Sequence, residues 1–404
     1  MSDALSQSKC EWKEAELGEI CDYIKRGFSP KYVEQDGHII INQRCIRNGT
    51  IDFSLSKLTS KERKITPEKM LIHGDILINS TGVGTAGRVA FFNQNLTATA
   101  DSHVSIVRVN AKRAKPLFVF YNLRGREEEI EGIAEGSTGQ IELGSERLKL
   151  LEILLPPLPE QIAIAEVLSS LDDKIDLLHR QNQTLEQMAE TLFRQWFLPG
   201  GRHGVEEADE GWEIVKLGNF ISTNISSLNK DYPHENIEYL DTGSLTQGKW
   251  GELQPFSLKE APSRAKRLVQ HNDILYSTVR PNQLHYGLVR NPIENLVVST
   301  GFCVIACDNI SPYFVYYLLT ENSMTEYLHS IAEGSTSTYP SLKPDDLEAV
   351  EFALPPAHSL KKFHYLSNSA WNKIEHNYNQ IHTLTALRDT VLPKLMSGEV
   401  NVCE

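Results

Sequence analysis

Two glycine-rich segments of this 404-residue chain have the spacing of loops that bind phosphate groups. Gly82-Val83-Gly84-Thr85-Ala86-Gly87 satisfies the GxGxxG pattern, and Gly243 to Trp250 nearly satisfies the P-loop pattern. A dinucleotide site needs a helix that starts at the glycines, whereas Arg88 to Phe92 has the composition of a strand. A P-loop needs a hydroxyl residue after its lysine, but Trp250 follows Lys249. We therefore expect ordinary turns, the first a hairpin whose backbone amides could approach a phosphate group.

Templates for other catalytic sites are not matched either. Pro156-Pro157 has a leucine on each side, whereas an amino-methyltransferase motif needs an acidic residue, Asn or Ser before the prolines and an aromatic residue after them. Asp345 and Glu351 are spaced roughly like nuclease carboxylates, but the lysine that should accompany them is missing. We therefore expect no catalytic residues in this chain.

The six cysteines do not indicate a metal or redox site. They are scattered, without any CxxC pair, at Cys10, Cys21, Cys45, Cys303, Cys307 and Cys403. Cys303 and Cys307 lie in the apolar stretch 301–307, which has the composition of a buried strand. Core cysteines are the preferred interpretation, and we expect neither a metal ion nor a cofactor in this chain.

An internal repeat organises the chain. Trp12 to Gly18 recurs as Trp212 to Gly218, and Ala134-Glu135-Gly136-Ser137-Thr138 recurs unchanged at Ala332 to Thr336. Three further segments recur in the same order, with 73–77 matching 271–275, 118–123 matching 314–319, and 155–157 matching 354–356. Offsets of 196 to 200 residues are too long for a solenoid repeat, so they indicate a tandem duplication of a domain with an appendage.

Each duplicated unit divides at its Leu-Pro-Pro sequence. Before that point, short β-like runs alternate with Gly, Asn and Pro, for example at 39–42, 76–79, 104–109 and 296–305. One helical stretch stands out in each half, near 117–131 and 312–332. After it comes a long helix with mixed polar and apolar positions. The Gly-rich, acidic segment 199–211 is typical of a surface linker between the halves.

The first long helix has the seam of a coiled coil. Its seam positions are separated by steps of four and three and are occupied by Ile164, Leu168, Leu171, Ile175, Leu178, Asn182, Leu185, Ala189, Leu192 and Trp196. The second helix is less regular, with Phe363, Leu366, Ala370, Ile374, Asn377, Ile381, Leu384, Val391 and Leu395. We expect the two helices to pack on each other, and residues 160–197 alone would span roughly 57 Å.

Each seam contains one asparagine, at 182 and at 377. If the helices are antiparallel and centred on each other, Asn182 lies near Asn377. A buried Asn pair would fix the register at some cost in stability. Two asparagines at a solvated edge fit the sequence equally well.

Basic and hydroxyl-bearing residues recur in both halves. We interpret the basic runs as occupying the same place in each unit, just before the His-x-Asp-Ile-Leu segments, where they form a solvated face or bind phosphate. The first-half candidates are Lys57, Lys61, Arg63, Lys64, Asn79, Ser80, Thr81, Arg88, Ser137, Thr138 and Gln140. The second-half candidates are Arg264, Lys266, Arg267, Ser277, Thr278, Arg280, Ser335, Thr336, Thr338 and Tyr339. Because Lys and Arg bind phosphates while Arg, Asn, Gln, Ser and Thr read base edges, these side chains form a candidate DNA interface.

The net charge of −13 argues against DNA binding through bulk charge. Residues 1–157 are neutral, with 21 basic and 21 acidic groups, and residues 211–358 carry 10 basic and 17 acidic groups. Any phosphate affinity must therefore come from local patches or from a partner. No apolar run is long enough to span a bilayer, and the polar segment 1–10 lacks a signal core, so we expect a cytoplasmic protein.

The arrangement resembles the specificity subunits of type I restriction–modification systems. The residues that carry the resemblance are 155–161 (Leu-Pro-Pro-Leu-Pro-Glu-Gln) with the helix that follows, 171–175, 74–77, 136–138 and 391–399. It covers the whole chain. Pro355-Pro356 departs from the pattern, because no Glu-Gln follows, and this leaves the start of the second helix less certain.

The resemblance implies an α/β fold with two similar target-recognition domains, separated by two long antiparallel coiled-coil helices. The expected segments are 1–157 and 212–356 for the domains, 158–198 and 357–400 for the helices, and 199–211 for the linker. It further implies that each domain reads one part of a bipartite, asymmetric DNA target. Two modification subunits would bind S-adenosylmethionine and methylate adenine, and restriction subunits would bind ATP and Mg²⁺.

Three other interpretations remain open. The chain could be the specificity subunit of a related restriction system that is not type I. It could be a coiled-coil scaffold whose domains bind protein without DNA specificity. It could also transfer methyl groups or cleave DNA by itself, although the missing motifs argue against this. The DNA target itself does not follow from the sequence, since side-chain geometry and DNA shape decide it together.

Overall fold

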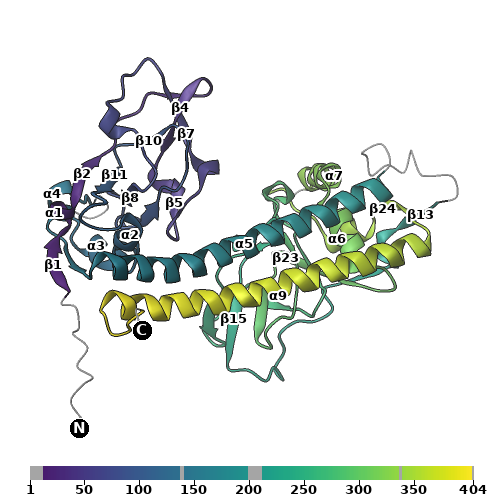
Figure 1. Ribbon diagram of the computed structural model, residues 1–404. Helices are drawn as coiled ribbons and strands as arrows, with labels where there is room; N and C mark the ends of the chain where they lie inside the picture. The colour runs from purple at the N-terminus through teal and green to yellow at the C-terminus, as the bar shows by residue number, and fades with distance from the viewer. Residues whose placement is uncertain (1–11, 137–140, 199–211, 336–338, 403–404) are drawn as a thin grey trace, which may run out of the picture. The chain divides into compact units, whose positions relative to one another are not determined.

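The computed structural model describes residues 12–136, 141–198, 212–335 and 339–402 (Figure 1). The chain divides into two compact units, and both boundaries fall within the long helices. Unit 1 is Met1–Asp176 with Ile381–Glu404, and unit 2 is Leu177–Gln380. The sheets and short helices of each unit are therefore packed with about half of each long helix, a division that the domain boundaries expected from the sequence did not include.

Unit 1 contains two four-stranded sheets and a small terminal ladder. The first sheet is antiparallel, in the order β2 (Cys21–Arg26), β11 (Val104–Val109), β8 (Ile76–Asn79) and β9 (Val89–Phe91). The second sheet has the order β10 (Ala98–Ala100), β4 (Gly37–Ile41), β7 (Lys57–Ser60) and β3 (Tyr32–Val33). The ladder pairs β1 (Lys13–Glu16) with β12 (Glu152–Leu155), and a short hairpin pairs β5 (Ile46–Arg47) with β6 (Thr50–Ile51).

Unit 2 repeats most of this plan. Its first sheet has the order β14 (Ile221–Thr223), β23 (Phe302–Cys307), β20 (Ile274–Ser277) and β21 (Tyr286–Leu288). Its second sheet has the order β18 (Gln254–Ser257), β15 (Asn236–Leu240), β22 (Leu296–Ser299) and β19 (Ala265–Leu268). The ladder pairs β13 (Glu213–Lys216) with β24 (Glu351–Leu354), and β16 (Leu245–Thr246) pairs with β17 (Lys249–Trp250). The tandem duplication inferred from the sequence is confirmed.

The helical stretch expected in each half is two consecutive helices. In unit 1 these are α2 (Pro116–Arg124) and α3 (Glu127–Gly132), and in unit 2 they are α6 (Pro312–Thr320) and α7 (Asn322–Glu333). Phe118 and Phe314 are buried at equivalent positions, so α2 and α6 cover the first sheet of their own unit. Short helices complete the units at α1 (Leu17–Ile20), α4 (Ser145–Lys149) and α8 (Pro344–Glu348).

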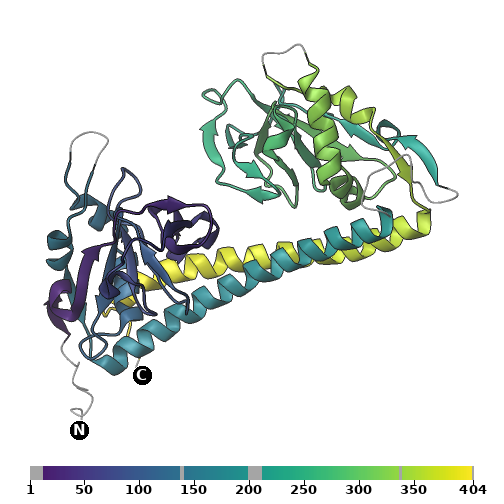
Figure 2. The same ribbon diagram turned by 90° about the horizontal axis from the view of Figure 1, so that it is seen from above.

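The long helices are α5 (Leu158–Phe197) and α9 (Ala357–Met396). Within unit 1, Asp172 of α5 forms an ion pair with Arg388 of α9 at 2.8 Å. Within unit 2, the rings of Phe193 and Phe363 lie 6.0 Å apart between centroids. Asn182 of α5 also meets Asn377 of α9 within unit 2. The residue number on α9 thus falls as the number on α5 rises, so the helices pair antiparallel there (Figure 2).

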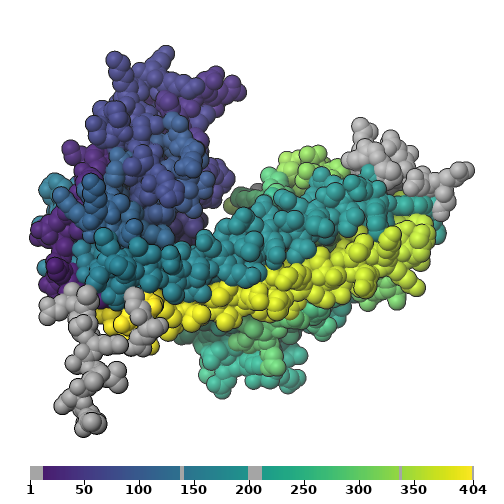
Figure 3. Space-filling model, viewed as in Figure 1, coloured from purple at the N-terminus to yellow at the C-terminus, as the bar shows by residue number. Residues whose placement is uncertain are grey.

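The seam residues of α5 are removed from solvent. Ile164, Leu168, Leu178 and Asn182 are buried, and Leu171, Ile175, Leu185 and Leu192 are partly buried. On α9, Asn377 is buried while Ile381 and Leu384 are partly buried. The other faces of both helices remain at the surface beside each other (Figure 3).

Two neighbouring seam positions of α9 were each misassigned by one residue from the sequence. Leu366 is exposed, and the next residue, Ser367, is buried instead. The irregular spacing of apolar residues in this part of α9 hid the shift, because Trp371 rather than Ala370 packs into the core of unit 2. The large indole fixes the rotation of the helix here.

The cysteines behave as expected of small apolar residues. Cys45 and Cys303 are fully buried, and burial raises the pKa of the Cys303 thiol to about 12. Cys10 and Cys403 lie outside the described residues. Among the helices that the structure describes, none combines the length and the apolar composition needed to cross a membrane.

Candidate nucleic-acid interface

Three segments of the backbone meet at the end of β8 in unit 1, and we call this arrangement the junction of the unit. The amide of Ser80 donates to the carbonyl of His103 at 2.8 Å, and the amide of Leu143 donates to the carbonyl of Ser80 at 2.8 Å. Thr81 forms an isolated bridge with Glu142. The junction therefore brings the hydroxyl-rich turn against the segment that follows the first Gly-Ser-Thr sequence.

Unit 2 contains the same junction at the end of β20. The amide of Thr278 donates to the carbonyl of Gly301 at 2.9 Å, and the amide of Leu342 donates to the carbonyl of Thr278 at 2.7 Å. Val279 forms the isolated bridge, with Ser341. Because the two junctions agree bond by bond, the duplicated sequence segments hold equivalent surface turns, and the side chains on those turns are free to differ.

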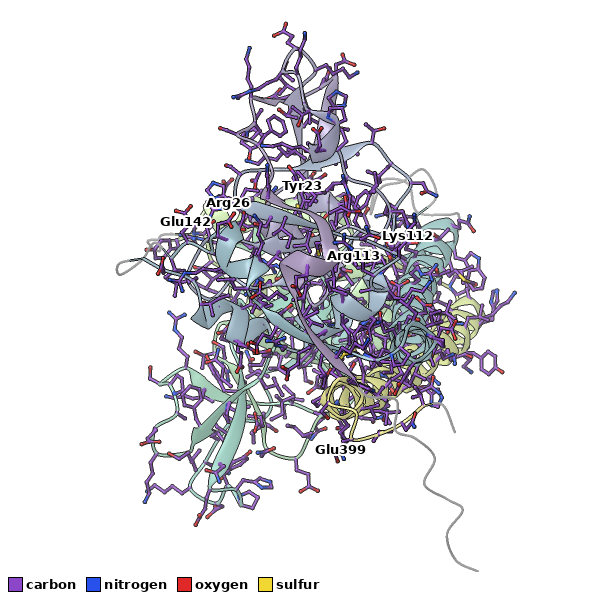
Figure 4. All side chains as sticks on the ribbon, turned by 60° about the vertical axis from the view of Figure 1, so that its left-hand side comes forward. Tyr23, Arg26, Lys112, Arg113, Glu142 and Glu399 are labelled. Atoms are coloured by element: carbon purple, nitrogen blue, oxygen red, sulfur yellow. The ribbon has the colours of Figure 1, made fainter. Side chains whose placement is uncertain are left out.

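Arg26 of β2 clamps the junction in unit 1. Its guanidinium donates to the carbonyl of Leu143 at 2.9 Å and forms an ion pair with Glu142 (Figure 4). Charge-assisted bonds to both a backbone carbonyl and a carboxylate hold this segment in place. Arg26 is therefore a supporting residue, and it did not stand out in the sequence because it lies far from the recurring motifs.

Three of the expected contact residues are unavailable to DNA. Asn79, Ser80 and Ser277 are 0%, 0% and 2% exposed. The Ser80 hydroxyl lies 2.6 Å from that of Ser105, and the Ser277 hydroxyl donates to the carbonyl of Val279. These buried side chains stabilise the turns from inside the unit. The prediction that the three residues contact DNA was therefore wrong.

The neighbouring turn residues do reach the surface. Thr81 is partly exposed and donates to Gln43 Oε1 at 2.9 Å, and its hydroxyl lies 2.9 Å from His103 Nδ1. Arg88 is partly exposed and donates to the carbonyl of Gly84 at 2.8 Å. Thr278 is also partly exposed and donates to the carbonyl of Gly301. Gln43 and His103 are polar surface residues that no sequence motif indicated.

The first basic run lies on β7 and just after it. Lys57, Lys61, Arg63 and Lys64 are all exposed. The Lys57 ammonium sits 4.6 Å from the ring centroid of Tyr32, which is itself 48% exposed, and the Arg63 guanidinium lies 6.0 Å from that of Phe28. Exposed cations beside aromatic rings can bind phosphate while the rings supply a stacking surface. The sequence showed the cations but not their aromatic neighbours, because Phe28 and Tyr32 lie earlier in the chain and meet the run through the fold.

This basic run connects to the junction through Asp101. Phe28 forms a bridge with Asp101, whose carboxylate accepts a bond from the amide of His103 at 2.8 Å. Burial raises the pKa of the Asp101 carboxyl and opposes the lowering effect of that bond. The first basic run and the hydroxyl turn are thus joined by a short chain of contacts within unit 1.

The second basic run does not occupy the equivalent place. In unit 1 the run starts on β7, which pairs antiparallel with β4. In unit 2 the corresponding antiparallel pair is β18 with β15, so β18 is the equivalent of β7. Arg264, Lys266 and Arg267 instead lie at β19, on the other edge of the sheet, next to β22. The prediction that the two basic runs occupy the same place in each unit was therefore wrong. Both runs precede the Asp-Ile-Leu strand in the sequence, but strands that are not equivalent carry them.

The second run nevertheless approaches the junction of unit 2. The amide of Thr300 donates to the carbonyl of Arg264 at 2.8 Å, and Gly301 next to it accepts from Thr278. Arg264 and Lys266 are exposed, whereas Arg267 is partly buried and donates to the Ser227 hydroxyl at 3.2 Å. Arg280 and Tyr339 are both exposed and stack on each other at the same junction.

Both glycine-rich segments are hairpin turns, as expected. Gly82 to Gly87 connects β8 to β9, and Gln247-Gly248 connects β16 to β17 with positive φ angles of 49° and 74°. In the first turn, however, the amide of Gly84 already donates to the Glu131 carboxylate at 2.7 Å. A phosphate could use this amide only by displacing Glu131.

Five expected contact residues, Ser137, Thr138, Gln140, Thr336 and Thr338, lie outside the described residues. Ser335 is described and partly buried, with its hydroxyl 3.4 Å from that of Ser341. Among the described residues beyond the gaps, Glu142 and Ser341 belong to the junctions.

The fold and its paired junctions define a protein with two related α/β recognition units. The family model described as the type I restriction modification DNA specificity domain matches residues 9–187 and again residues 209–377, and the chain belongs to this family. The resemblance stated from the motifs is thereby confirmed, including its extension over both halves.

Individual relatives agree with this assignment. The chain is 29% identical to the type I restriction enzyme MjaIX specificity subunit of Methanocaldococcus jannaschii over 364 residues, which cover 86% of this chain and 82% of that relative. It is 32% identical to the HindI specificity subunit of Haemophilus influenzae over 175 residues, 43% of this chain and 38% of that relative. The crystal structure of a type-I restriction-modification S subunit from M. genitalium has the same fold, with a TM-score of 0.60 at 16% identity, covering 97% of this chain and 98% of that one.

Proposed function

We propose that this chain is the specificity subunit of a type I restriction–modification enzyme and reads a bipartite, asymmetric DNA target, one part with each unit. The observation that carries the proposal is the pair of matched junctions with different exposed side chains. Unit 1 presents Thr81 and the glycine turn, whereas unit 2 presents Thr278 and Arg280. Two units that recognise different half-sites need the same backbone support but different exposed side chains, and the two junctions have this property.

The charge distribution supports a role within a complex. A chain of net charge −13 repels the DNA backbone at long range, and the basic runs at β7 and β19 are local patches within this acidic chain. Two modification subunits, docked on the long helices, would supply further phosphate contacts and S-adenosylmethionine for adenine methylation. Restriction subunits would bring ATP and Mg²⁺. Such a complex would act in the cytoplasm, and the chain itself would remain non-catalytic.

Modular reading can be tested by exchanging one unit's domain. Replacing residues 1–157 with the equivalent segment of another family member should change one half of the methylated motif and leave the other half intact. Sequencing of methylated adenines in cells that carry the chimera with the modification subunit provides the measurement. A change in both halves would contradict one reader per unit, and complexes without any sequence-selective methylation would favour a protein-binding scaffold.

Partner dependence is tested with purified components. The isolated chain should bind DNA weakly and with little preference in moderate salt, whereas addition of the modification subunit should tighten binding and create specificity. The slope of affinity against salt concentration should steepen on assembly, because more phosphates are contacted. Tight, specific DNA binding by the chain alone would contradict the proposed dependence on the modification subunit.

A further inference from the structure

The turn after β20 in unit 2 has an unusual backbone. Arg280 is in the left-handed region at φ 50°, ψ 67°, and Leu284 is there too, at φ 59°. A side chain at positive φ is disfavoured by contact with its own backbone, and the following Pro281 restricts Arg280 further. A conformation of this kind persists only where the surrounding structure imposes it, and such positions cluster at functional sites.

The junction imposes this conformation from three directions. The Arg280 amide donates to the carbonyl of Pro340 at 3.0 Å, and the Arg280 carbonyl accepts from the amide of Gln283 at 2.9 Å. One residue earlier, Val279 bridges to Ser341. Thr278 is held through both its amide and its hydroxyl by the carbonyl of Gly301. The base of the Arg280 side chain is therefore fixed although the residue lies at the surface.

The far end of the side chain is also fixed. The guanidinium carbon lies 4.6 Å from the ring centroid of Tyr339, which is 55% exposed. Within the described part of the chain, no carboxylate forms an ion pair with Arg280. A cation–π contact of this kind requires none of the N–H groups of the guanidinium, so Tyr339 supports the donor fork without neutralising it.

Unit 1 has no counterpart of this arginine. The equivalent position is Gly82, at an offset of 198, and it is followed by Val83 and Gly84 in an open glycine turn. The nearby Arg88 turns back to the carbonyl of Gly84. The arginine and its aromatic support are thus a property of one reader, placed on a framework that both readers share.

Resting on the function proposed above, we propose that Arg280, supported by Tyr339, is the residue with which unit 2 recognises a guanine in its half-site. A guanidinium fork matches the O6 and N7 acceptors of guanine in the major groove, which makes arginine the usual reader of this base. A fork whose position is set before binding loses little side-chain entropy on contact. A flexible arginine would be sufficient for a phosphate, whereas a strained, doubly supported arginine is suited to reading a base edge.

The main variant is Arg280→Gly, because glycine adopts φ 50° without strain and the turn is retained while the guanidinium is removed. Arg280→Lys retains a positive charge without the fork, Tyr339→Phe retains the ring, and Tyr339→Leu removes it. Arg264→Ala serves as the matched control, because Arg264 is an exposed arginine near the same junction. The thermal unfolding midpoint of each variant verifies that it folds.

Each variant is assembled with its modification subunit, and two quantities are measured: the methylated motif by sequencing, and binding to duplexes with single base-pair changes in the half-site of unit 2. That half-site is identified as the part of the motif that changes when residues 212–356 are exchanged. Arg280→Gly and Arg280→Lys should lose roughly 5- to 150-fold discrimination at one G·C pair, Tyr339→Leu should lose part of it, and Tyr339→Phe should retain it. Arg264→Ala should weaken all duplexes alike.

Three outcomes would overturn the proposal. In the first, Arg280→Gly weakens binding uniformly and leaves the motif unchanged, as loss of a phosphate contact would. In the second, relaxed specificity appears in the half-site of unit 1. In the third, Arg280→Lys behaves as the wild type. A wild-type complex without any methylated motif would instead contradict the proposed function of the whole chain, so the two failures are distinguishable.

Discussion

The side-chain amide of Asn377 donates a 2.8 Å hydrogen bond to the side-chain oxygen of Asn182 between the two long helices within unit 2. The two residues are 0% and 3% exposed, so the pair is buried in the seam rather than placed at a solvated edge. Asn377 also lies 3.3 Å from Gln181 Oε1. A buried polar pair in a mostly apolar seam favours the one register in which the two amides meet.

Asn182→Leu alone should lower the free energy of unfolding by roughly 1–3 kcal/mol, because it removes the closer of the two acceptors of the buried Asn377 amide. The double variant Asn182→Leu/Asn377→Leu should recover most of that loss, since both polar groups are gone, but its register should be less unique. Urea denaturation followed by circular dichroism measures the first effect, and a mixture of gap lengths in the methylated motif reports the second. Gln183→Leu, at an exposed neighbouring position, is the control and should change little. If the single and double variants lost the same free energy of unfolding, Asn182 and Asn377 would not stabilise the fold through their interaction.

Asp75 and Asp273 occupy equivalent positions but have different partners. Asp75 is fully buried and accepts from Arg108 Nε and Nη2, both at 2.7 Å. The strand register places Ala306 where unit 1 has Arg108. Among the residues that the structure describes, Asp273 is supported only by the backbone amide of Gln270. Burial without a cation raises the pKa of the Asp273 carboxyl to about 6.

The two aspartates should therefore respond oppositely to replacement by asparagine. Because the folded-state pKa of Asp273 lies above its unfolded value, its stabilising contribution is present below about pH 4 and is lost as the pH rises through about 6. Asp273→Asn should equal or exceed the wild type in stability at pH 8, with a difference of up to about 3 kcal/mol. Asp75→Asn should lose roughly 3–5 kcal/mol at the same pH, because it leaves Arg108 unpaired. Unfolding curves at pH 4.5 and pH 8 measure both effects, and a wild-type pH dependence unchanged by Asp273→Asn would contradict this account.

Two glycines of the hairpin in unit 1 differ in what surrounds them. Gly87 and Gly84 have φ angles of 84° and 71°, so both are strained by any side chain. A Cβ on Gly87 would lie 2.7 Å from the carbonyl oxygen of Glu127 in α3, whereas a Cβ on Gly84 would meet no atom within 4 Å. We expect Gly84→Ala to cost about 1 kcal/mol and Gly87→Ala roughly 2–5 kcal/mol. Thermal unfolding midpoints compare the two, and equal costs would mean that α3 moves away without penalty.

The continuous helices predict how the gap in the DNA target is set. Four residues inserted after Gln183 in α5 and four after Glu375 in α9 would lengthen both helices by about 6 Å and by about one turn, at positions that face each other next to the Asn pair. The recognised half-sites should stay the same while the unread gap between them grows by one or two base pairs. Paired insertions of two residues should instead rotate the seam by about 200° and abolish assembly with the modification subunit. Motif sequencing decides, and an active four-residue variant with an unchanged gap would show that another feature sets the spacing.

Local patterns were sufficient for the outline of this protein. The recurring segments defined the duplication, and the steps of four and three placed Ile164, Leu168 and Asn182 in the seam, because burial along a helix follows its own periodicity. β8 and β11 were predicted at their observed bounds for a similar reason, since each is an apolar run bounded by turn residues. The family resemblance rested on these same elements.

Only the tertiary structure decided which polar side chains face solvent and which partners they meet. Ser80 and Thr81 are neighbours of similar chemistry, but the pairing of β8 with β11 buries the first and leaves the second at the surface. The two basic runs lie on strands that are not equivalent in their sheets, Asp273 lacks the arginine that Asp75 has, and Arg280 stacks on Tyr339. Each of these facts depends on contacts between residues distant in sequence, and neither residue type nor local spacing specifies which strands pair and which side chains meet across them.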